Sequence, residues 1–249
     1  MMRVLLLGGT TEASQLAQAL HSARIETIFS YAGRTNAPVS QPVTVRVGGF
    51  GGADGLATYL KNEGISHVVD ATHPFANTMG QNAYQACRKS GLPLMRLARP
   101  AWRAQAGDHW THVPDIANAC VALPKPATRI FLAIGRMHVD QFAARPEHHY
   151  LLRLVDAPEE PIALPDYHVT LARGPFDVSG DVALMQEHRI THVVAKNAGG
   201  SGAAAKIEAA RALGLRIIMI DRPLRPDVAE YANIGAVLAW LTHSTERGV

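Results

Sequence analysis

The chain has 249 residues, 47% of them hydrophobic, which is enough for one large core or two of modest size. Its net charge of +3 suits an anionic ligand, whereas the absence of a Lys/Arg block with interleaved aromatic residues argues against a nucleic-acid partner. No run reaches about 18 apolar residues, so a membrane span is not expected. The short apolar start leads directly into the fold and is not typical of a signal peptide.

Cys87 and Cys120 each lie within an apolar helical pattern, which indicates small core residues rather than disulfide partners. Such cysteines fit a reducing cytoplasm, where we expect the protein to be located. The chain has twelve histidines but no CxxC pair, and no metal site is expected.

The first βα unit spans residues 3–20. An apolar run ends at Gly8 and Gly9, Thr10 or Thr11 can cap the helix that follows, and Glu12 falls in its first turn. Two glycines before a helix N-terminus predict an anion site. The sequence GGTTEA is not the GxGxxG pattern, so an ordinary βα turn remains the alternative.

A second strand is predicted at residues 25–31, ending at Gly33, Arg34 and Thr35. In a dinucleotide-binding fold this strand end meets the adenosine ribose, where an acidic residue favours NAD and an arginine accommodates the 2′-phosphate of NADP. Arg34 without an acidic neighbour favours NADPH. The alternative is that Arg34 is a solvated loop residue.

The third predicted strand, residues 43–47, is followed by Gly48-Gly49-Phe50-Gly51-Gly52, which we interpret as a ligand wall. A helix over 55–62 and a strand over 67–71 lead to a turn that contains Thr72, His73 and Phe75. His73 can be a proton donor, a hydrogen-bond donor to a carboxylate, or a capping residue.

A helix is predicted over 77–90 and a strand over 94–97, after which Arg99 and Arg103 flank Trp102 and suit a flat anionic partner. A helix over 116–123 then ends at the Pro-rich segment 123–127. This segment predicts two domains, residues 1–124 and 125–249.

The pattern of the first half returns in the second. Strands are predicted at 129–134, 151–155, 168–172 and 191–195, and Arg173-Gly174-Pro175-Phe176 stands where the glycine-rich segment stood earlier. ISHVVDATHPF from Ile65 resembles ITHVVAKNAGG from Ile190, and GLPLMRLARP from Gly91 resembles GLRIIMIDRP from Gly214. The repeat predicts two similar α/β halves with parallel sheets and a ligand cleft between them.

The segment from Lys196 to Gly202 precedes a predicted helix over 203–213 and forms a second anion site in our interpretation. Lys196 supplies a mobile cation and the glycines expose N–H groups. A glycine-rich turn with a solvated lysine is the alternative. A last helix is predicted over 234–243.

Eight segments carry a family resemblance. LLLGGTTEA, AGRT, VGGFGG, VVDATHPFA, RPAW, ARGPF, KNAGGSG and IDRP, in this order from Leu5 to Pro223, resemble the precorrin-6A reductase family of vitamin B12 biosynthesis. The resemblance implies two Rossmann-like halves and an NADPH-dependent reduction of the C18=C19 bond of precorrin-6A to precorrin-6B.

The resemblance also implies roles for site residues. The cofactor would be bound by Gly8, Gly9, Thr10, Thr11, Glu12, Gly33, Arg34 and Thr35. The tetrapyrrole substrate would be bound by Gly49, Phe50, Gly51, Thr72, His73, Phe75, Arg99, Arg173, Lys196, Asn197, Gly199, Gly200, Ser201 and Gly202. His73 and then Lys196 are the catalytic candidates for delivering a proton.

Several alternatives stay open. The enzyme could act on cobalt-precorrin-6A with NADH, the protein could carry a tetrapyrrole without catalysis, or both anion sites could serve a transferase or isomerase of sugar nucleotides. Transient contacts with other enzymes of the cobalamin pathway are compatible with the resemblance. An exchange of a strand between the two halves is compatible with duplicated halves joined by a short linker.

Overall fold

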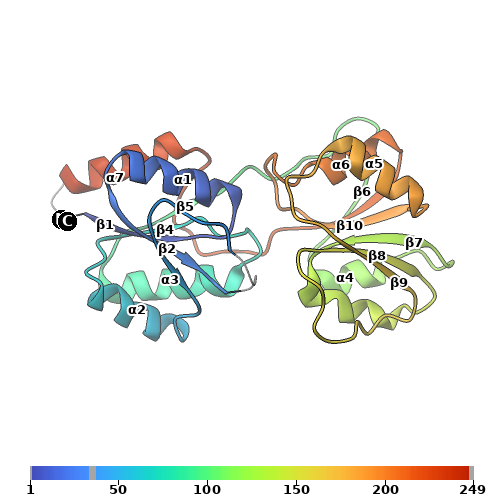
Figure 1. Ribbon diagram of the computed structural model, residues 1–249, viewed down its shortest axis with the longest axis horizontal. Helices are drawn as coiled ribbons and strands as arrows, with labels where there is room; N and C mark the ends of the chain where they lie inside the picture. Colours follow the sequence, from blue (N-terminus) through green and yellow to red (C-terminus); the bar gives the residue numbers. More distant parts are fainter. Residues whose placement is uncertain (1, 34–37, 247–249) are drawn as a thin grey trace. The chain divides into compact units, whose positions relative to one another are not determined.

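The computed structural model describes residues 2–33 and 38–246 of the chain (Figure 1). Contacts divide it into a first unit, Met1–Pro100 with Leu224–Val249, and a second unit, Ala101–Pro223. Each unit contains one sheet of six parallel strands, as the predicted fold class requires. No helix of the described residues is both long and apolar enough to cross a membrane.

The first unit has the strand order β12-β5-β4-β1-β2-β3. Its strands are β1 (Arg3–Leu7), β2 (Glu26–Tyr31), β3 (Thr44–Val47), β4 (His67–Asp70), β5 (Leu94–Leu97) and β12 (Ala229–Tyr231); its helices are α1 (Thr11–Ser22), α2 (Gly52–Asn62), α3 (Asn77–Ser90) and α7 (Ile234–Glu246). The sheet lies between α1 with α7 and α2 with α3 (Figure 1). Strand β1 is apolar on both faces because Val4 and Leu6 contact the first helix pair while Leu5 and Leu7 contact the second.

The second unit repeats this topology with the order β6-β11-β10-β7-β8-β9. Its strands are β6 (His109–Val113), β7 (Arg129–Ala133), β8 (His149–Leu154), β9 (Tyr167–Leu171), β10 (His192–Lys196) and β11 (Arg216–Ile220); its helices are α4 (Ile116–Val121), the 3₁₀ helix η1 (Arg136–Ala144), α5 (Val178–Glu187) and α6 (Ala205–Ala212). Phe131, Leu151, Val193 and Ile217 form the centre of its core.

The two halves of the sequence exchange their last strands. Strand β6 follows the first half in the sequence but pairs with β11, and β12 follows the second half but pairs with β5. The predicted boundary at residues 124 and 125 was therefore wrong, because it lies inside the second unit. The Pro-rich segment 123–127 connects α4 to β7 within that unit.

Candidate functional site

The predicted site residues that the structure describes all lie at the carboxyl ends of strands, the edge at which parallel α/β sheets bind ligands. They are Gly8 to Glu12 after β1, Gly33 after β2, Gly49 to Gly51 after β3, Thr72, His73 and Phe75 after β4, Arg99 after β5, Arg173 after β9, and Lys196 to Gly202 at the end of β10 and beyond it. Arg34 and Thr35 lie outside the described residues. His73 belongs to the first unit and Lys196 to the second.

The two glycines after β1 have different roles. A Cβ on Gly8 would lie 2.1 Å from the ring of Phe29, so only glycine lets the chain pass over that ring. Gly9 has a φ of +117°, a conformation that side chains disfavour, and apart from its chain neighbours no atom of the described residues lies within 4 Å of the position a Cβ would take. Among the described residues, the backbone at Gly9 therefore faces open space in front of a helix.

Thr10, one of the two residues predicted as the cap of that helix, is the N-cap of α1. Its hydroxyl oxygen accepts a hydrogen bond from the N–H of Ala13 at 3.1 Å and donates one to the carbonyl of Ala71 at 2.9 Å. The cap thus joins the N-terminus of α1 to the turn after β4. Because β1 lies between β2 and β4, this is the point at which the strand order reverses.

The equivalent place in the second unit is built differently. After β7 the chain passes through Gly135 into the 3₁₀ helix η1, which has no side-chain cap. A 3₁₀ helix has poorer hydrogen-bond geometry than an α-helix. The two units therefore differ at this position, with a capped α-helix in the first and an uncapped 3₁₀ helix in the second.

Glu12 lies in the first turn of α1 and forms an ion pair with Arg99, with 2.6 Å between Oε2 and Nη1. Both side chains are largely buried. Together with Thr10, Thr72 and Pro74 they line a small pocket. The arginine offsets the negative charge that Glu12 would otherwise place at this helix N-terminus.

The turn after β4 carries His73. The Nδ1 atom of His73 accepts a hydrogen bond from the N–H of Phe75 at 3.2 Å. An accepting Nδ1 assigns the proton of the neutral ring to Nε2. This contact lies within the turn, and α3 begins after Ala76 without a side-chain cap, so His73 does not have the capping role considered for it.

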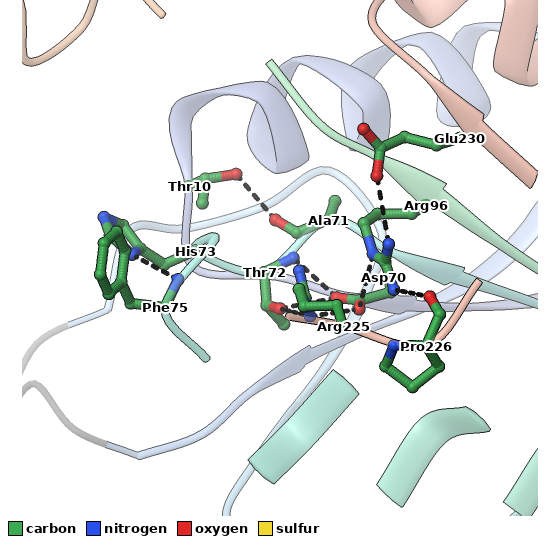
Figure 2. A network of polar contacts seen from close by, with 10 residues as sticks. All are labelled: Thr10, Asp70, Ala71, Thr72, His73, Phe75, Arg96, Arg225, Pro226 and Glu230. Atoms are coloured by element: carbon green, nitrogen blue, oxygen red, sulfur yellow. Dashed lines mark hydrogen bonds and ion pairs between the residues drawn. The ribbon is translucent and has the colours of Figure 1, made fainter. Parts of the chain in front are cut away.

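A buried network supports this turn, and Figure 2 shows its contacts. The Oδ1 atom of Asp70 accepts hydrogen bonds from the backbone N–H of Thr72 at 3.1 Å and from its hydroxyl at 2.6 Å. The Oδ2 atom accepts one from Nη2 of Arg225 at 2.7 Å, and Nε of Arg96 lies 3.8 Å from the same oxygen. Arg96 also donates to the carboxylate of Glu230 at 3.1 Å. Sequence reasoning singled out neither arginine.

The glycine-rich segment after β3 is held by another arginine that sequence reasoning did not single out. The guanidinium of Arg46 lies 3.8 Å from the ring centroid of Phe50. It donates hydrogen bonds to the hydroxyl of Ser30 and to the carbonyls of Gly48 and Gly49. Phe50 is thus held from one side by a stacked cation.

In the second unit, the loop after β10 is held by Trp102. The Oδ1 atom of Asn197 accepts from the N–H of Trp102 at 2.8 Å, and its Nδ2 donates to the carbonyl of the same residue at 3.0 Å. The indole N–H of Trp102 donates to the carbonyl of Gly200 at 2.8 Å. Arg222 donates to the carbonyls of Asn197 and Ala198. The amide of Asn197 therefore orders the loop, and the positive φ of Gly199 and Gly200 shapes it.

The remaining predictions concern charges and thiols. Arg173 lies 3.7 Å from Asp156 on a partly exposed surface. Both cysteines are buried, and burial, with a smaller effect of Asp70, raises the pKa of Cys87 to about 12. Within residues 2–33 and 38–246, no group of three potential ligands could hold a metal ion.

Comparison with known proteins gives one consistent result. The family model described as precorrin-6x reductase CbiJ/CobK matches residues 3–242. The chain is 57% identical to the precorrin-6A reductase of Rhodobacter capsulatus over the full length of both, and 45% identical to that of a Sinorhizobium species, covering 97% of this chain and 93% of the relative. A solved structure named CobK precorrin-6A reductase matches with a TM-score of 0.95 at 57% identity, covering 98% of this chain and 97% of that one.

Proposed function

The chain belongs to the precorrin-6A reductase family and reduces its tetrapyrrole substrate in cobalamin biosynthesis, and we propose that NADPH donates the hydride that saturates C18=C19 to give precorrin-6B. The observation that carries this proposal is the capped N-terminus of α1, which stands beside open space at the reversal of the strand order. A cytoplasmic location, where reduced nicotinamides are available, fits the proposal.

The residues of the turn between β1 and α1 are suited to bind a dinucleotide. The open space at Gly9 lets a pyrophosphate approach the backbone, and the first N–H groups of α1 supply donors. Thr11 is the first residue of α1 and adds a hydroxyl there. Because Arg99 neutralises Glu12, the acidic side chain does not repel the phosphates.

The preference for NADPH rests on Arg34, with Thr35 beside it, in the segment that follows β2 in the sequence. We expect Arg34→Ala to weaken NADPH binding about 10- to 100-fold, because a charge-assisted hydrogen bond to the 2′-phosphate is lost. NADH lacks that phosphate, so its affinity should stay nearly unchanged. Fluorescence titration of both cofactors measures the difference, with Arg88→Ala on the exposed face of α3 as the control. Equal losses for both cofactors would remove Arg34 from this role.

The substrate carries several carboxylates, which cationic and N–H groups are suited to bind. In the second unit these are Arg173, Lys196 and the backbone from Gly199 to Gly202, which Trp102 and Arg222 hold in place. In the first unit, Phe50 and Phe75 offer apolar surface for a flat ring. The metal-free macrocycle is the substrate that we propose.

The reduction needs one hydride and one proton. Bound NADPH would supply the hydride, and the chain has to align the reactants and provide a proton. We assign that proton to His73 in its imidazolium form, in which both ring nitrogens carry a proton and Nδ1 no longer accepts from the N–H of Phe75. Donation from Nε2 then leaves a neutral ring with its proton on Nδ1. Lys196 and water are the next candidates.

An anaerobic titration tests the function as a whole. NADPH and then precorrin-6A are added to the protein while the absorbance near 340 nm and the macrocycle spectrum are followed together. Oxidation of NADPH in step with the macrocycle change supports the proposal, and a faster reaction with NADH would reverse the cofactor preference. Macrocycle binding without NADPH consumption would instead support a carrier, and no binding of either molecule would favour a sugar-nucleotide enzyme.

A further inference from the structure

Arg225 lies on the segment that returns from the second unit to the first. The two units divide between Pro223 and Leu224, and Leu224 is 95% exposed. The next side chain, that of Arg225, is buried in the first unit. The chain therefore places an arginine inside the first unit immediately after entering it.

The guanidinium of Arg225 is enclosed by specific neighbours. Its Nη2 atom donates to Oδ2 of Asp70 at 2.7 Å and lies 3.4 Å from the hydroxyl of Thr72. A Cβ on Gly80 of α3 would come within 2.3 Å of the same nitrogen. Asp70 is only 2% exposed, so its carboxylate depends on protein donors for its hydrogen bonds.

These contacts continue to the predicted site. Asp70 binds both the N–H and the hydroxyl of Thr72, and Ala71 between them accepts the hydrogen bond from the helix cap Thr10. Thr72 in turn lines the pocket beside Glu12. A displacement of Arg225 would thus reach the turn that carries His73 through two hydrogen-bonded steps (Figure 2).

The sequence repeat places Trp102 at the position equivalent to Arg225, since RPAW from Arg99 corresponds to RPLR from Arg222. Trp102 binds Asn197, and Asn197 is equivalent to Thr72 in the other repeated segment. In each unit, the segment that arrives from the other half of the sequence therefore binds a turn. In the first unit this is the turn after β4, which pairs with β1, and in the second unit it is the turn after β10, which pairs with β7. The same connection at two equivalent places argues for a role in shaping the site.

We propose that Arg225 is a positioning residue for the reduction: through Asp70 it holds Thr72 and the turn bearing His73 against the N-terminus of α1. This inference rests on the proposed function, which places cofactor and substrate at that turn. It predicts that a disturbed Arg225 slows the chemical step far more than it weakens cofactor binding, because misplacement of a catalytic group by about 1 Å can cost about 100-fold in rate.

Two variants and one control test this role. Arg225→Lys keeps the charge but cannot bind Asp70 and Thr72 in the same geometry. Gly80→Ala leaves every polar group in place and pushes the guanidinium aside, although alanine is the better helix former. The control, Glu230→Gln, removes the ion pair between Arg96 and Glu230 without touching Asp70 or Thr72.

Each protein is examined by thermal unfolding, NADPH fluorescence titration and the anaerobic single-turnover rate at saturating NADPH and precorrin-6A. The expected result is a rate about 100-fold lower for both test variants, with NADPH affinity within about three-fold of the parent and a control that reacts normally. The proposal is overturned if both test variants react at the normal rate. It is also overturned if Glu230→Gln loses as much rate as the test variants at a loss of thermal stability similar to theirs. Failure of the proposed function would appear separately, as a parent protein that does not oxidise NADPH with precorrin-6A.

Discussion

His73 is the residue whose chemistry the proposed mechanism needs most. Its Nδ1 atom accepts the N–H of Phe75, and an asparagine oxygen can accept the same hydrogen bond without providing an acidic proton. We expect His73→Asn to lower the single-turnover rate about 10²- to 10⁴-fold, the usual contribution of a general acid, while NADPH binding is retained. His109→Asn, at the exposed start of β6, is the control. A normal rate in His73→Asn would transfer the proton donor role to Lys196 or water.

Sequence reasoning at the scale of single residues succeeded where the cause is local. The Thr10 cap was predictable because a threonine before an apolar helical stripe meets an N–H three residues later. The pairing of Glu12 with Arg99 joins residues 87 positions apart, and the bond from Trp102 to Asn197 spans 95. No local pattern specifies such pairs, so residues predicted to bind ligands turned out to bind one another.

At the scale of elements, the buried strands and the edge strands β3 and β9 were predicted, whereas the edge strands β6 and β12 were not. Strands β1, β4 and β10 are apolar runs buried at the centre of each sheet, and the structure confirms them. In contrast, β6 is mostly exposed and β12 entirely so, which removes the apolar signal. Because these two strands are the exchanged ones, missing them also placed the domain boundary at the Pro-rich segment.

The exchange of strands places the C-terminal helix, α7, in the core of the first unit. Val237 and Leu241 of α7 are fully buried against α1. We expect Leu241→Ala to lower the free energy of unfolding by about 2–5 kcal/mol, as large-to-small substitutions in cores do. Hydrogen exchange read by mass spectrometry should show faster exchange in β1 and α1 and little change in β7 and β8. Faster hydrogen exchange confined to the second unit would contradict the exchange of strands between the two halves of the sequence.

At the scale of the whole molecule, the two units share one strand topology but differ in the helices and loops that follow the strands. The first unit has an α-helix with a threonine cap after its central strand, and the second has a 3₁₀ helix there. The second unit instead has an ordered glycine loop after β10, bound by Trp102 and Arg222. The duplicated fold thus places a capped α-helix in one unit and an ordered glycine loop in the other, and we propose that the first binds the cofactor phosphates and the second the substrate carboxylates.

Each unit also buries a histidine that favours the neutral form. Burial lowers the pKa of His67 in the first unit and of His148 in the second. His148 is fully buried, and the loss of hydration outweighs the carboxylate of Glu147, whose Oε1 lies 3.5 Å from Nε2. Both units are therefore expected to lose stability in acid.

The direction of this pH effect follows from proton linkage. A histidine of the unfolded chain titrates near pH 6.5, so below that pH the unfolded state binds more protons than the folded state and the free energy of unfolding falls. Each fully buried histidine contributes at most about 1.4 kcal/mol per pH unit. We expect His148→Phe, which keeps a ring beside Tyr150, to unfold in urea with a weaker pH dependence between pH 7 and 5 than the parent, whereas His109→Phe should behave as the parent does. A pH dependence unchanged by His148→Phe would mean that His148 is not a source of acid sensitivity.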